Sequence, residues 1–449
     1  MESTVSPEKR RVYIETYGCQ MNVADSEVVL SVMDSAGYER TTTLAKADVV
    51  FVNTCAVREN AEERIYGRLG DFKHLKKDNP ALVVGVLGCM AERLRKDLLE
   101  SKSFVDLVVG PDEYRRLPEL VDNAVAGEKG IAVRLSRVEN YDDIVPLRTD
   151  GLCAWVSVMR GCDKFCTFCV VPFTRGRERS RTLSSVVREI EDLVQRGFRE
   201  VTLLGQNVNS YRDGEFDFAD LLVSVADIDS TLRVRFTTSH PQDMSDKLIR
   251  TIAGRNNICK YVHLPVQSGS DRVLELMNRT YSSSQYRQLV KRIRETIPGV
   301  SLSTDIISGF PTETGEDHKK TIDLLREVRF DGAFTFKYSP RENTKAWHMG
   351  DSVPEAVKVE RLNEIIDVQR EISVSLNRAM VGQTVEVLVE GESRKSSLES
   401  CGRTGTNKMV VFPRNGHAPG QFTSVKIERV NSATLFGVLV EGRDSLQSV

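Results

Sequence analysis

Short apolar runs alternate with longer amphipathic stretches along most of the chain, and this alternation restricts the possible folds more than any other feature. In the first part of the chain the apolar runs are rich in β-branched residues, and each precedes a stretch with helical periodicity. The expected strands are 12–16, 48–53, 81–87 and 105–109, and the expected helices are 25–36, 58–77, 92–99 and 111–124. Strands that alternate with helices form parallel sheets through βαβ units. The sequence therefore predicts an N-terminal open parallel α/β domain.

A second series of the same kind begins after a polar, aperiodic stretch that contains Pro146. Its expected strands are 154–159, 200–204, 232–237, 261–264, 301–307 and 333–338, and its expected helices include 184–196, 218–225 and 283–295. Strands joined by helical crossovers predict a central α/β domain, an open and partial (β/α)6 barrel.

After a helical segment at 355–378 the pattern changes to short alternating runs separated by glycines and polar turns. The expected strands are 384–390, 409–413, 422–430 and 434–440. Such runs are typical of a small antiparallel β-barrel. A chain of 449 residues has room for several domains. We expect an N-terminal domain at 10–127, a linker at 128–150, a central domain at 151–378 and a barrel at 379–444.

Composition excludes several classes of protein. The chain is 40% hydrophobic and 28% charged, and no apolar run approaches the roughly 20 residues that a membrane span needs. Its first residues are polar and lack the apolar stretch of a secretory signal, so we expect a cytoplasmic protein with no membrane partner. A net charge of -2 argues against a surface uniformly adapted to nucleic acid, although local basic patches could still contact phosphates. No oligomer interface is evident, and we expect a monomer.

Three of the nine cysteines, Cys162, Cys166 and Cys169, lie in one short loop with the spacing C-x3-C-x2-C. Iron-sulfur clusters are held by thiolates, and a four-iron cluster with only three leaves one iron open to another ligand. The alternative is half of a zinc site or a set of core thiols, but zinc sites usually have four ligands in paired C-x2-C units. The spacing therefore favours a reactive iron-sulfur cluster.

Three other cysteines each follow an expected strand of the N-terminal domain: Cys19, Cys55 and Cys89. The carboxyl ends of parallel strands share one edge of a sheet, where ligands bind. We therefore expect a second three-cysteine site, with buried structural thiols as the alternative. Of the remaining cysteines, Cys153 and Cys259 are expected to be core residues, and Cys401 is expected to lie in a polar loop.

The cysteine loop and its flank, from Gly161 to Gly176, resemble those of the radical S-adenosylmethionine (SAM) methylthiotransferases. Similar motifs of that family match 16–22, 53–60 and 88–90, and the resemblance extends from Val12 to Gly442, with a C-terminal part that resembles the RNA-binding TRAM domain. The segments 203–211 and 238–241 resemble the branch that modifies N6-isopentenyladenosine in tRNA. One departure is Glu92, where glutamine is common.

The resemblance implies two [4Fe-4S] clusters. Cys162, Cys166 and Cys169 would hold the radical SAM cluster, which cleaves SAM to a 5'-deoxyadenosyl radical. The second trio would hold the cluster that carries the inserted sulfur, and two SAM molecules would serve each turnover. The product would be 2-methylthio-N6-isopentenyladenosine next to the anticodon. Implied partners are tRNA with isopentenyladenosine in its anticodon loop and a reductant such as flavodoxin or ferredoxin, whereas the sulfur donor and any catalytic residue beyond the clusters stay unknown.

Polar residues at the carboxyl ends of the central strands are candidates for the SAM pocket, because loops at this end build the active sites of βα barrels. They are Gln206, Asn207, Ser239, Gln267 and Asp305. Each could instead be a capping or turn residue. Candidates for RNA contact are basic residues near the cysteine loop and in the barrel, with a solvated charged surface as the alternative: Arg175, Arg177, Arg179, Lys408 and Arg414.

Two other functions remain open at this point. The same chemistry could act on threonylcarbamoyl-adenosine in tRNA or on a ribosomal protein. Alternatively, the chain could be a non-catalytic iron-sulfur protein that binds RNA. That function predicts four protein ligands for each cluster, which the cysteines do not provide.

Overall fold

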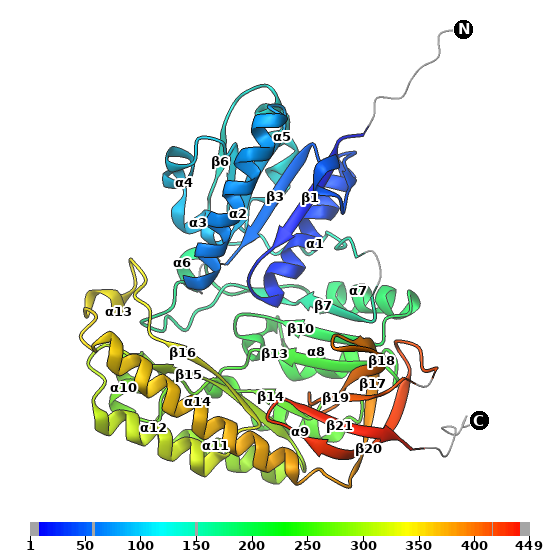
Figure 1. Cartoon of the computed structure of the whole chain (residues 1–449), viewed down its shortest axis with the longest axis vertical. Coiled ribbons are helices and arrows are strands. Elements are labelled where there is room, and N and C mark those ends of the chain that lie inside the picture. Colours follow the sequence, from blue (N-terminus) through cyan, green and yellow to red (C-terminus); the bar gives the residue numbers. More distant parts are fainter. Residues whose placement is uncertain (1–8, 56–58, 149–150, 415, 441–449) are drawn as a thin grey trace.

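Figure 1 shows three domains, in a computed structural model that describes residues 9–55, 59–148, 151–414 and 416–440, with only the backbone for 59–64. The N-terminal domain lies at the top of the view, the central domain lies below it, and the C-terminal barrel lies at the lower right. Some expected features fall outside the described residues: the helix start at 58, the linker residues 149 and 150, and the barrel end beyond 440. Within the described residues, no helix combines the length and apolar character that crossing a membrane requires.

The N-terminal domain is a parallel sheet with the strand order β2-β1-β3-β4-β5-β6. Its strands are β1 (Arg11–Thr16), β2 (Glu39–Arg40), β3 (Val49–Thr54), β4 (Val83–Gly88), β5 (Leu107–Val109) and β6 (Gly130–Ala132). Its helices are α1 (Gln20–Ser35), α2 (Glu59–Asp78), α3 (Cys89–Leu94), α4 (Lys96–Ser101) and α5 (Leu117–Val125), with short 3-10 turns η1 (Leu44–Lys46) and η2 (Tyr114–Arg116). Every residue of β3 and β4 is buried, as expected for central parallel strands covered on both faces.

This domain agrees with the predicted architecture, although some of its elements differ. The edge strand β2 was not predicted. Strand β6 pairs with β5 although it lies inside the predicted linker, so the sheet extends to Ala132. The single helix expected at 92–99 is two short helices, which meet at Arg95 with a φ of 50°. Positive φ is uncommon for a residue with a side chain and interrupts helical geometry.

The central domain has the six predicted strands: β7 (Cys153–Ser157), β10 (Glu200–Leu204), β13 (Arg233–Thr237), β14 (Tyr261–His263), β15 (Ser301–Ser308) and β16 (Gly332–Lys337). Parallel pairing gives two three-stranded sheets, β7-β10-β13 and β14-β15-β16. An isolated parallel bridge between Val234 and Ile258 connects them. The open, partial barrel is therefore confirmed.

Its larger helices are α7 (Leu183–Gln195), α8 (Phe218–Ala226), α9 (Asp246–Gly254), α11 (Ser283–Thr296), α12 (Gly315–Val328) and α14 (Glu355–Arg378). The smaller elements are β8 (Met159–Arg160), α6 (Val171–Thr174), β9 (Arg179–Ser180), η3 (Val208–Ser210), β11 (Arg212–Asp213), β12 (Phe216–Asp217), η4 (Pro241–Asp243), α10 (Asp271–Leu276) and α13 (Lys345–His348).

The C-terminal domain is a closed barrel with the strand order β17-β18-β19-β21-β20. Its strands are β17 (Thr384–Ser393), β18 (Ser396–Thr404), β19 (Met409–Pro413), β20 (Phe422–Val430) and β21 (Thr434–Leu439). Strand β18 was not predicted, and Cys401 lies in this strand rather than in a loop. The barrel is also not wholly antiparallel, because β19 and β21 pair in parallel.

The central sheet separates the other two domains. Met21 and Ala24 of α1 pack on Leu204 and Trp155, which places the N-terminal domain against β7 and β10. At the amino ends of the strands, Arg233 Nη1 donates to the Arg403 carbonyl at 2.6 Å, and Arg235 Nη2 donates to the Thr404 carbonyl at 2.8 Å. The C-terminal barrel therefore docks at the edge of the sheet opposite the cysteine loop, as Figure 1 also shows.

Candidate metal centres and cofactor pocket

The structure brings Cys19, Cys55 and Cys89 together at the carboxyl edge of the N-terminal sheet. Cys19 caps α1, Cys55 follows β3, and Cys89 begins α3 directly after β4. A hydrogen bond from Cys55 and the charge of Arg175 lower the pKa of the Cys19 thiol to about 6. Burial raises the pKa of the Cys89 thiol. One acidified thiol beside buried thiols indicates a site suited to a metal centre with thiolate ligands.

Gly18 allows this convergence. Its φ is 129°, and a Cβ added to it would lie 2.5 Å from the Cβ of Cys55. Glycine adopts positive φ readily and has no side chain that would collide with a close neighbour. The backbone can therefore turn from β1 into α1 directly against Cys55.

Cys162, Cys166 and Cys169 lie in the loop between β8 and α6. The backbone holds this loop closely, because Cys162 N donates to the Gly176 carbonyl at 3.2 Å and Cys169 N donates to the Cys166 carbonyl at 3.0 Å. Burial raises the pKa of Cys162 to about 11 and that of Cys169 to about 12. These thiols favour the protonated form unless a bound metal cation stabilises their thiolates.

In each cysteine trio, a buried arginine donates a hydrogen bond to one cysteine sulfur. Arg175 Nε donates to Cys89 Sγ at 3.1 Å, and Arg279 Nη1 donates to Cys166 Sγ at 3.4 Å. Among the described residues, no group of three or more His, Cys, Asp or Glu side chains could hold a metal ion as placed. A four-iron cube takes each thiolate on a different iron, so its ligands lie further apart than those of one ion. Three thiols with a guanidinium donor fit such a cluster, since hydrogen bonds to its sulfurs tune its potential.

Three of the predicted SAM-pocket residues, Gln206, Ser239 and Gln267, carry a buried side-chain oxygen that lacks a hydrogen-bond partner within the described part of the chain. They follow β10, β13 and β14, so all lie at carboxyl ends of central strands. Buried polar atoms in proteins are nearly always satisfied, and each exception needs an explanation. Polar groups of a ligand bound at this edge of the barrel would satisfy all three.

The other two candidates have partners within the protein. Asn207 Nδ2 donates to Asp243 Oδ2 at 2.6 Å, and its Oδ1 accepts from the His240 backbone at 3.1 Å. Asp305 Oδ1 lies 3.4 Å from His263 Nε2. The amide of Asn207 is therefore used to order the loops after β10 and β13, rather than being available to SAM.

Three of the five predicted RNA contacts lie inside the protein or at a domain junction. Arg175 and Arg179 are buried, and they pair with Asp25 at 2.7 Å and Asp112 at 2.8 Å. The third, Lys408, lies 2.7 Å from Asp331 across the junction of the C-terminal barrel with the central domain. Burial keeps Arg175 and Arg179 from contacting a phosphate, whereas Lys408 is partly exposed and has its charge paired.

The two remaining candidates are accessible. Arg177 has a side chain that is 62% exposed and lies 3.1 Å from Asp163. Arg414 is also exposed and pairs with Glu392 at the surface.

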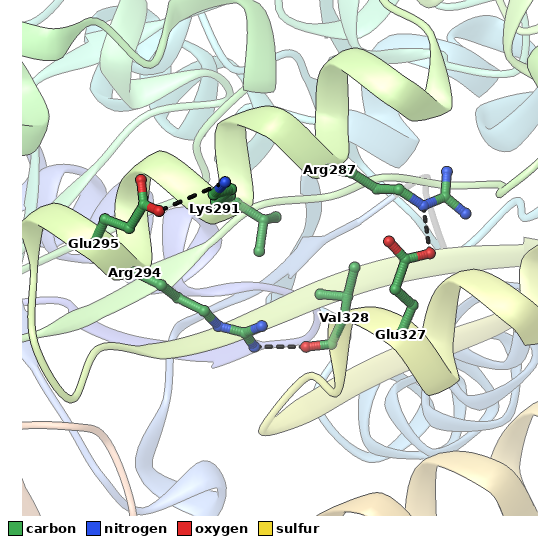
Figure 2. Close-up of a pocket in the computed structure, with 7 residues that line it drawn as sticks. Arg287, Lys291, Arg294, Glu295, Glu327 and Val328 are labelled. Carbon is green, nitrogen blue, oxygen red and sulfur yellow. Dashed lines mark hydrogen bonds and ion pairs between the residues drawn. The ribbon is translucent and has the colours of Figure 1, made fainter.

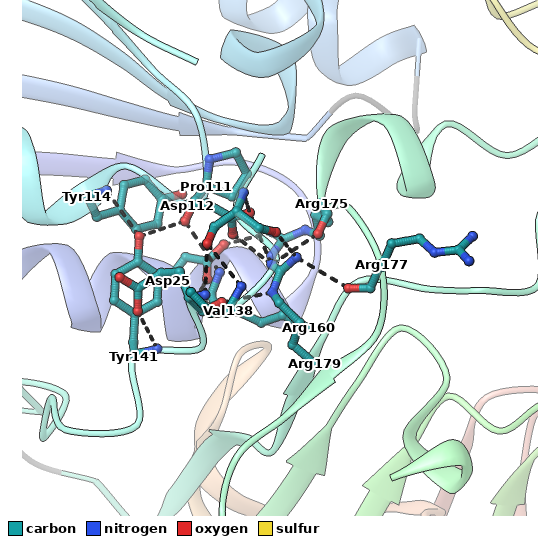
Figure 3. Close-up of polar contacts among 12 residues, drawn as sticks. Asp25, Pro111, Asp112, Tyr114, Val138, Tyr141, Arg160, Arg175, Arg177 and Arg179 are labelled. Carbon is teal, nitrogen blue, oxygen red and sulfur yellow. Dashed lines mark hydrogen bonds and ion pairs between the residues drawn. The ribbon is translucent and has the colours of Figure 1, made fainter. Parts of the chain in front are cut away.

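A buried polar network that was not predicted from the sequence lies between the N-terminal and central domains (Figure 3). Asp25 of α1 is fully buried and pairs with both Arg160 and Arg175, which flank the cysteine loop. Arg160 also stacks over Tyr141, with 4.6 Å between its Cζ and the ring centroid. Arg160 stands two residues before Cys162, and this adjacency was the available hint. No local pattern could have identified Asp25 as its partner.

A surface pocket of about 340 Å³ lies elsewhere, between α11 and α12 (Figure 2). Its charged groups are paired within the protein. Arg287 Nε lies 2.6 Å from Glu327 Oε2, and Arg294 Nη2 donates to the Val328 carbonyl at 2.5 Å. It belongs to the outer helical layer rather than to the edge that carries the cysteines.

The domain order agrees with three family matches. The uncharacterized protein family UPF0004 matches residues 11–110, the radical SAM superfamily matches 156–325, and the TRAM domain matches 378–440. Among solved structures, the radical SAM methyltransferase TsrM from Kitasatospora setae, with cobalamin and a [4Fe-4S] cluster bound, has a TM-score of 0.58 at 17% identity and covers 76% of this chain and 77% of its own. At this identity the likeness concerns the fold alone.

Full-length relatives are more informative. A protein of Chloroherpeton thalassium is 53% identical over 97% of this chain and 98% of its own length. One of Phocaeicola vulgatus is 53% identical over 97% of both chains. Both are named tRNA-2-methylthio-N(6)-dimethylallyladenosine synthase. The predicted resemblance is confirmed, and the chain belongs to the radical SAM family of tRNA-2-methylthio-N(6)-dimethylallyladenosine synthases.

Proposed function

We propose that this chain converts N6-isopentenyladenosine next to the anticodon of tRNA to its 2-methylthio derivative. The observation that carries the proposal is the meeting of two cysteine trios at one domain boundary. Val170, next to Cys169, packs on Cys89 of the other trio, and helix α3 contacts α6. Chemistry that joins a radical to a sulfur donor requires the reacting groups within a few ångströms.

The two cysteine trios would have separate roles. Cys162, Cys166 and Cys169 would hold a radical SAM [4Fe-4S] cluster, and the other trio would hold a second cluster that carries the inserted sulfur. When bound, SAM and the clusters would supply the radical and the methyl group, with two SAM molecules used per turnover. The buried oxygens of Gln206, Ser239 and Gln267 would bind polar groups of SAM. Burial at the domain boundary would keep water away from reactive species.

The substrate assignment rests on the relatives and on the accessibility of the target. A base in an anticodon loop can be splayed out and stacked without opening a helix. We retain Arg177 and Arg414 as proposed RNA contacts because their side chains are exposed. The remaining parts of the proposal are a reductant such as flavodoxin or ferredoxin, a monomeric state and a cytoplasmic location.

The test uses anaerobically reconstituted protein, SAM, a reductant, and tRNA with or without the isopentenyl group. Mass spectrometry of digested nucleosides should show the 2-methylthio product only with prenylated tRNA. Equal product without the prenyl group would remove the substrate assignment. Absence of 5'-deoxyadenosine under all conditions would instead favour a non-catalytic iron-sulfur protein.

A further inference from the structure

Arg175 connects the two cysteine trios. It stands at the end of α6, shortly after the cysteine loop, and its Nε donates to Cys89 Sγ of the other trio at 3.1 Å. Its Nη2 donates to Asp25 Oδ2 at 2.7 Å, and α1, which carries Asp25, begins directly after Cys19. A single side chain of the central domain therefore reaches two elements that position the second trio.

The charges around Arg175 are not balanced by the protein alone. Asp25 is fully buried and faces two guanidinium groups, those of Arg160 and Arg175. Asp112, a second buried carboxylate nearby, pairs with a third buried guanidinium, that of Arg179. Two carboxylates therefore face three buried cations, and buried charges require partners. Cys19 and Cys89 are the next groups that interact with Arg175 by charge. A thiolate-bound cluster at this trio would supply the missing negative charge.

Arg175 also has one donor nitrogen that makes no hydrogen bond within the described residues. Its Nη1 is buried and has no hydrogen-bond partner among the residues that the structure describes. Arginine does not lose its proton in proteins, so this N–H remains a donor in every state. An orphaned cationic donor beside three thiols indicates an anionic acceptor in the same space.

We propose that Arg175 is a positioning residue of the second cluster, with Nε bound to the Cys89 thiolate, Nη1 available to a further anionic sulfur, and Asp25 holding the guanidinium in place. This role rests on the proposed function, which requires a cluster at Cys19, Cys55 and Cys89. Cationic hydrogen bonds to cluster sulfurs favour the more negative, reduced state, because they compensate the added electron. Loss of Arg175 should therefore lower the reduction potential of this cluster.

The experiment isolates the second cluster in the full-length chain. Replacing Cys162, Cys166 and Cys169 by Ala removes the radical SAM cluster, so the remaining cluster can be titrated alone by electron paramagnetic resonance. In this background, Arg175→Gln removes the charge and replaces the three donor nitrogens of the guanidinium by one neutral amide, and Arg175→Lys keeps the charge but loses the planar fork. We expect Arg175→Gln to reduce the equilibrium constant for reduction at least tenfold, about 59 mV for a one-electron couple, and Arg175→Lys to have a smaller effect of the same sign.

Arg148→Gln is the matched control. Arg148 is also a buried arginine between the domains, but it pairs with Glu27 at 2.7 Å and with Glu189 at 2.8 Å, and within the described residues it donates to no sulfur. Its loss should leave the potential unchanged. Unchanged potentials in both Arg175 variants, or an equal shift in Arg148→Gln, would overturn the proposal. Loss of iron in Arg175→Gln alone, with iron retained in Arg148→Gln, would support it.

A measurement without any change at Arg175 covers the case in which its variants fail to fold. Protein labelled with nitrogen-15 in arginine should show nuclear coupling of an arginine nitrogen to the reduced second cluster. Absence of this coupling would contradict the role of Arg175. These spectroscopic results do not depend on product formation. A chain that shows the coupling but forms no methylthiolated nucleoside would refute the proposed function and leave this inference standing.

Discussion

Replacing Asp25 by Asn removes the negative charge that holds the N-terminal domain to the cysteine loop. Asp25 has no exposed surface and accepts from Arg160 and Arg175. The Asn side chain has nearly the same shape, but its amide NH2 would face one of the two guanidinium groups. The substitution therefore leaves two buried cations without their shared carboxylate.

The size of the effect follows from these contacts. A hydrogen bond to a charged group is worth about 1.5–3 kcal/mol, and both bonds from Asp25 are of this kind. Breaking a buried ion pair by removing one partner costs about 3–5 kcal/mol. We therefore expect Asp25→Asn to lower the free energy of unfolding by about 3–5 kcal/mol, a large share of the stability of a typical domain.

Urea unfolding of anaerobically reconstituted protein measures this loss, and hydrogen exchange locates it in α1 and the cysteine loop. The control is Asp192→Asn, which breaks an exposed i,i+4 pair with Arg196 at 3.2 Å. Such a pair is worth about 0.3–0.5 kcal/mol. If Asp25→Asn destabilises the protein no more than this control, the buried network does not hold the domains together.

Three further predictions concern the cysteine sites and the pocket. Gly18→Ala should remove the iron of the second cluster, because the added Cβ would collide with the Cβ of Cys55. Gly37→Ala is the control, since Gly37 also has positive φ but has open space around it, and this variant should keep its iron. The iron content per chain of the two variants measures the difference. Burial raises the pKa of Glu92 to about 7 from an ordinary value of 4.5, so the protonated form is favoured in the fold and stability should fall as pH rises from 4.5 through about 7. Glu92→Gln should remove this fall in thermal unfolding scans, and an unchanged pH profile would contradict it. Gln267→Ala should weaken SAM binding up to about tenfold, the worth of a neutral hydrogen bond, in a calorimetric titration; full affinity would place the pocket elsewhere.

Sequence patterns predicted the domains because the long elements are dominated by local periodicity. Strands β3 and β4 are largely apolar, and α14 was predicted with the bounds that the structure has, Glu355–Arg378. Strand β18 was missed because its segment is polar and its stability comes from pairing with β17 and β19. Helix α12 was not among the helices named from the sequence, because many of its residues are charged and its start depends on the capping box of Thr314 and Asp317.

The site was partly predictable for a similar reason. Topology alone places residues that follow parallel strands at one edge, so the proximity of Cys19, Cys55 and Cys89 could be predicted from the sequence. The misassigned arginines show the limit. A basic run such as the one that contains Arg175 and Arg179 looks like a nucleic-acid surface in the sequence, but its charge is matched by acids far away in the chain, Asp25 and Asp112. Long-range partners of this kind leave no local pattern.

Mössbauer spectroscopy of the anaerobically reconstituted chain tests the central claim most directly. The account predicts two four-iron clusters in the parent. Replacing Cys19, Cys55 and Cys89 by Ala should leave one, and the spectrum of that cluster should change when SAM is added. A parent with one cluster, or a variant that keeps both, would contradict the account.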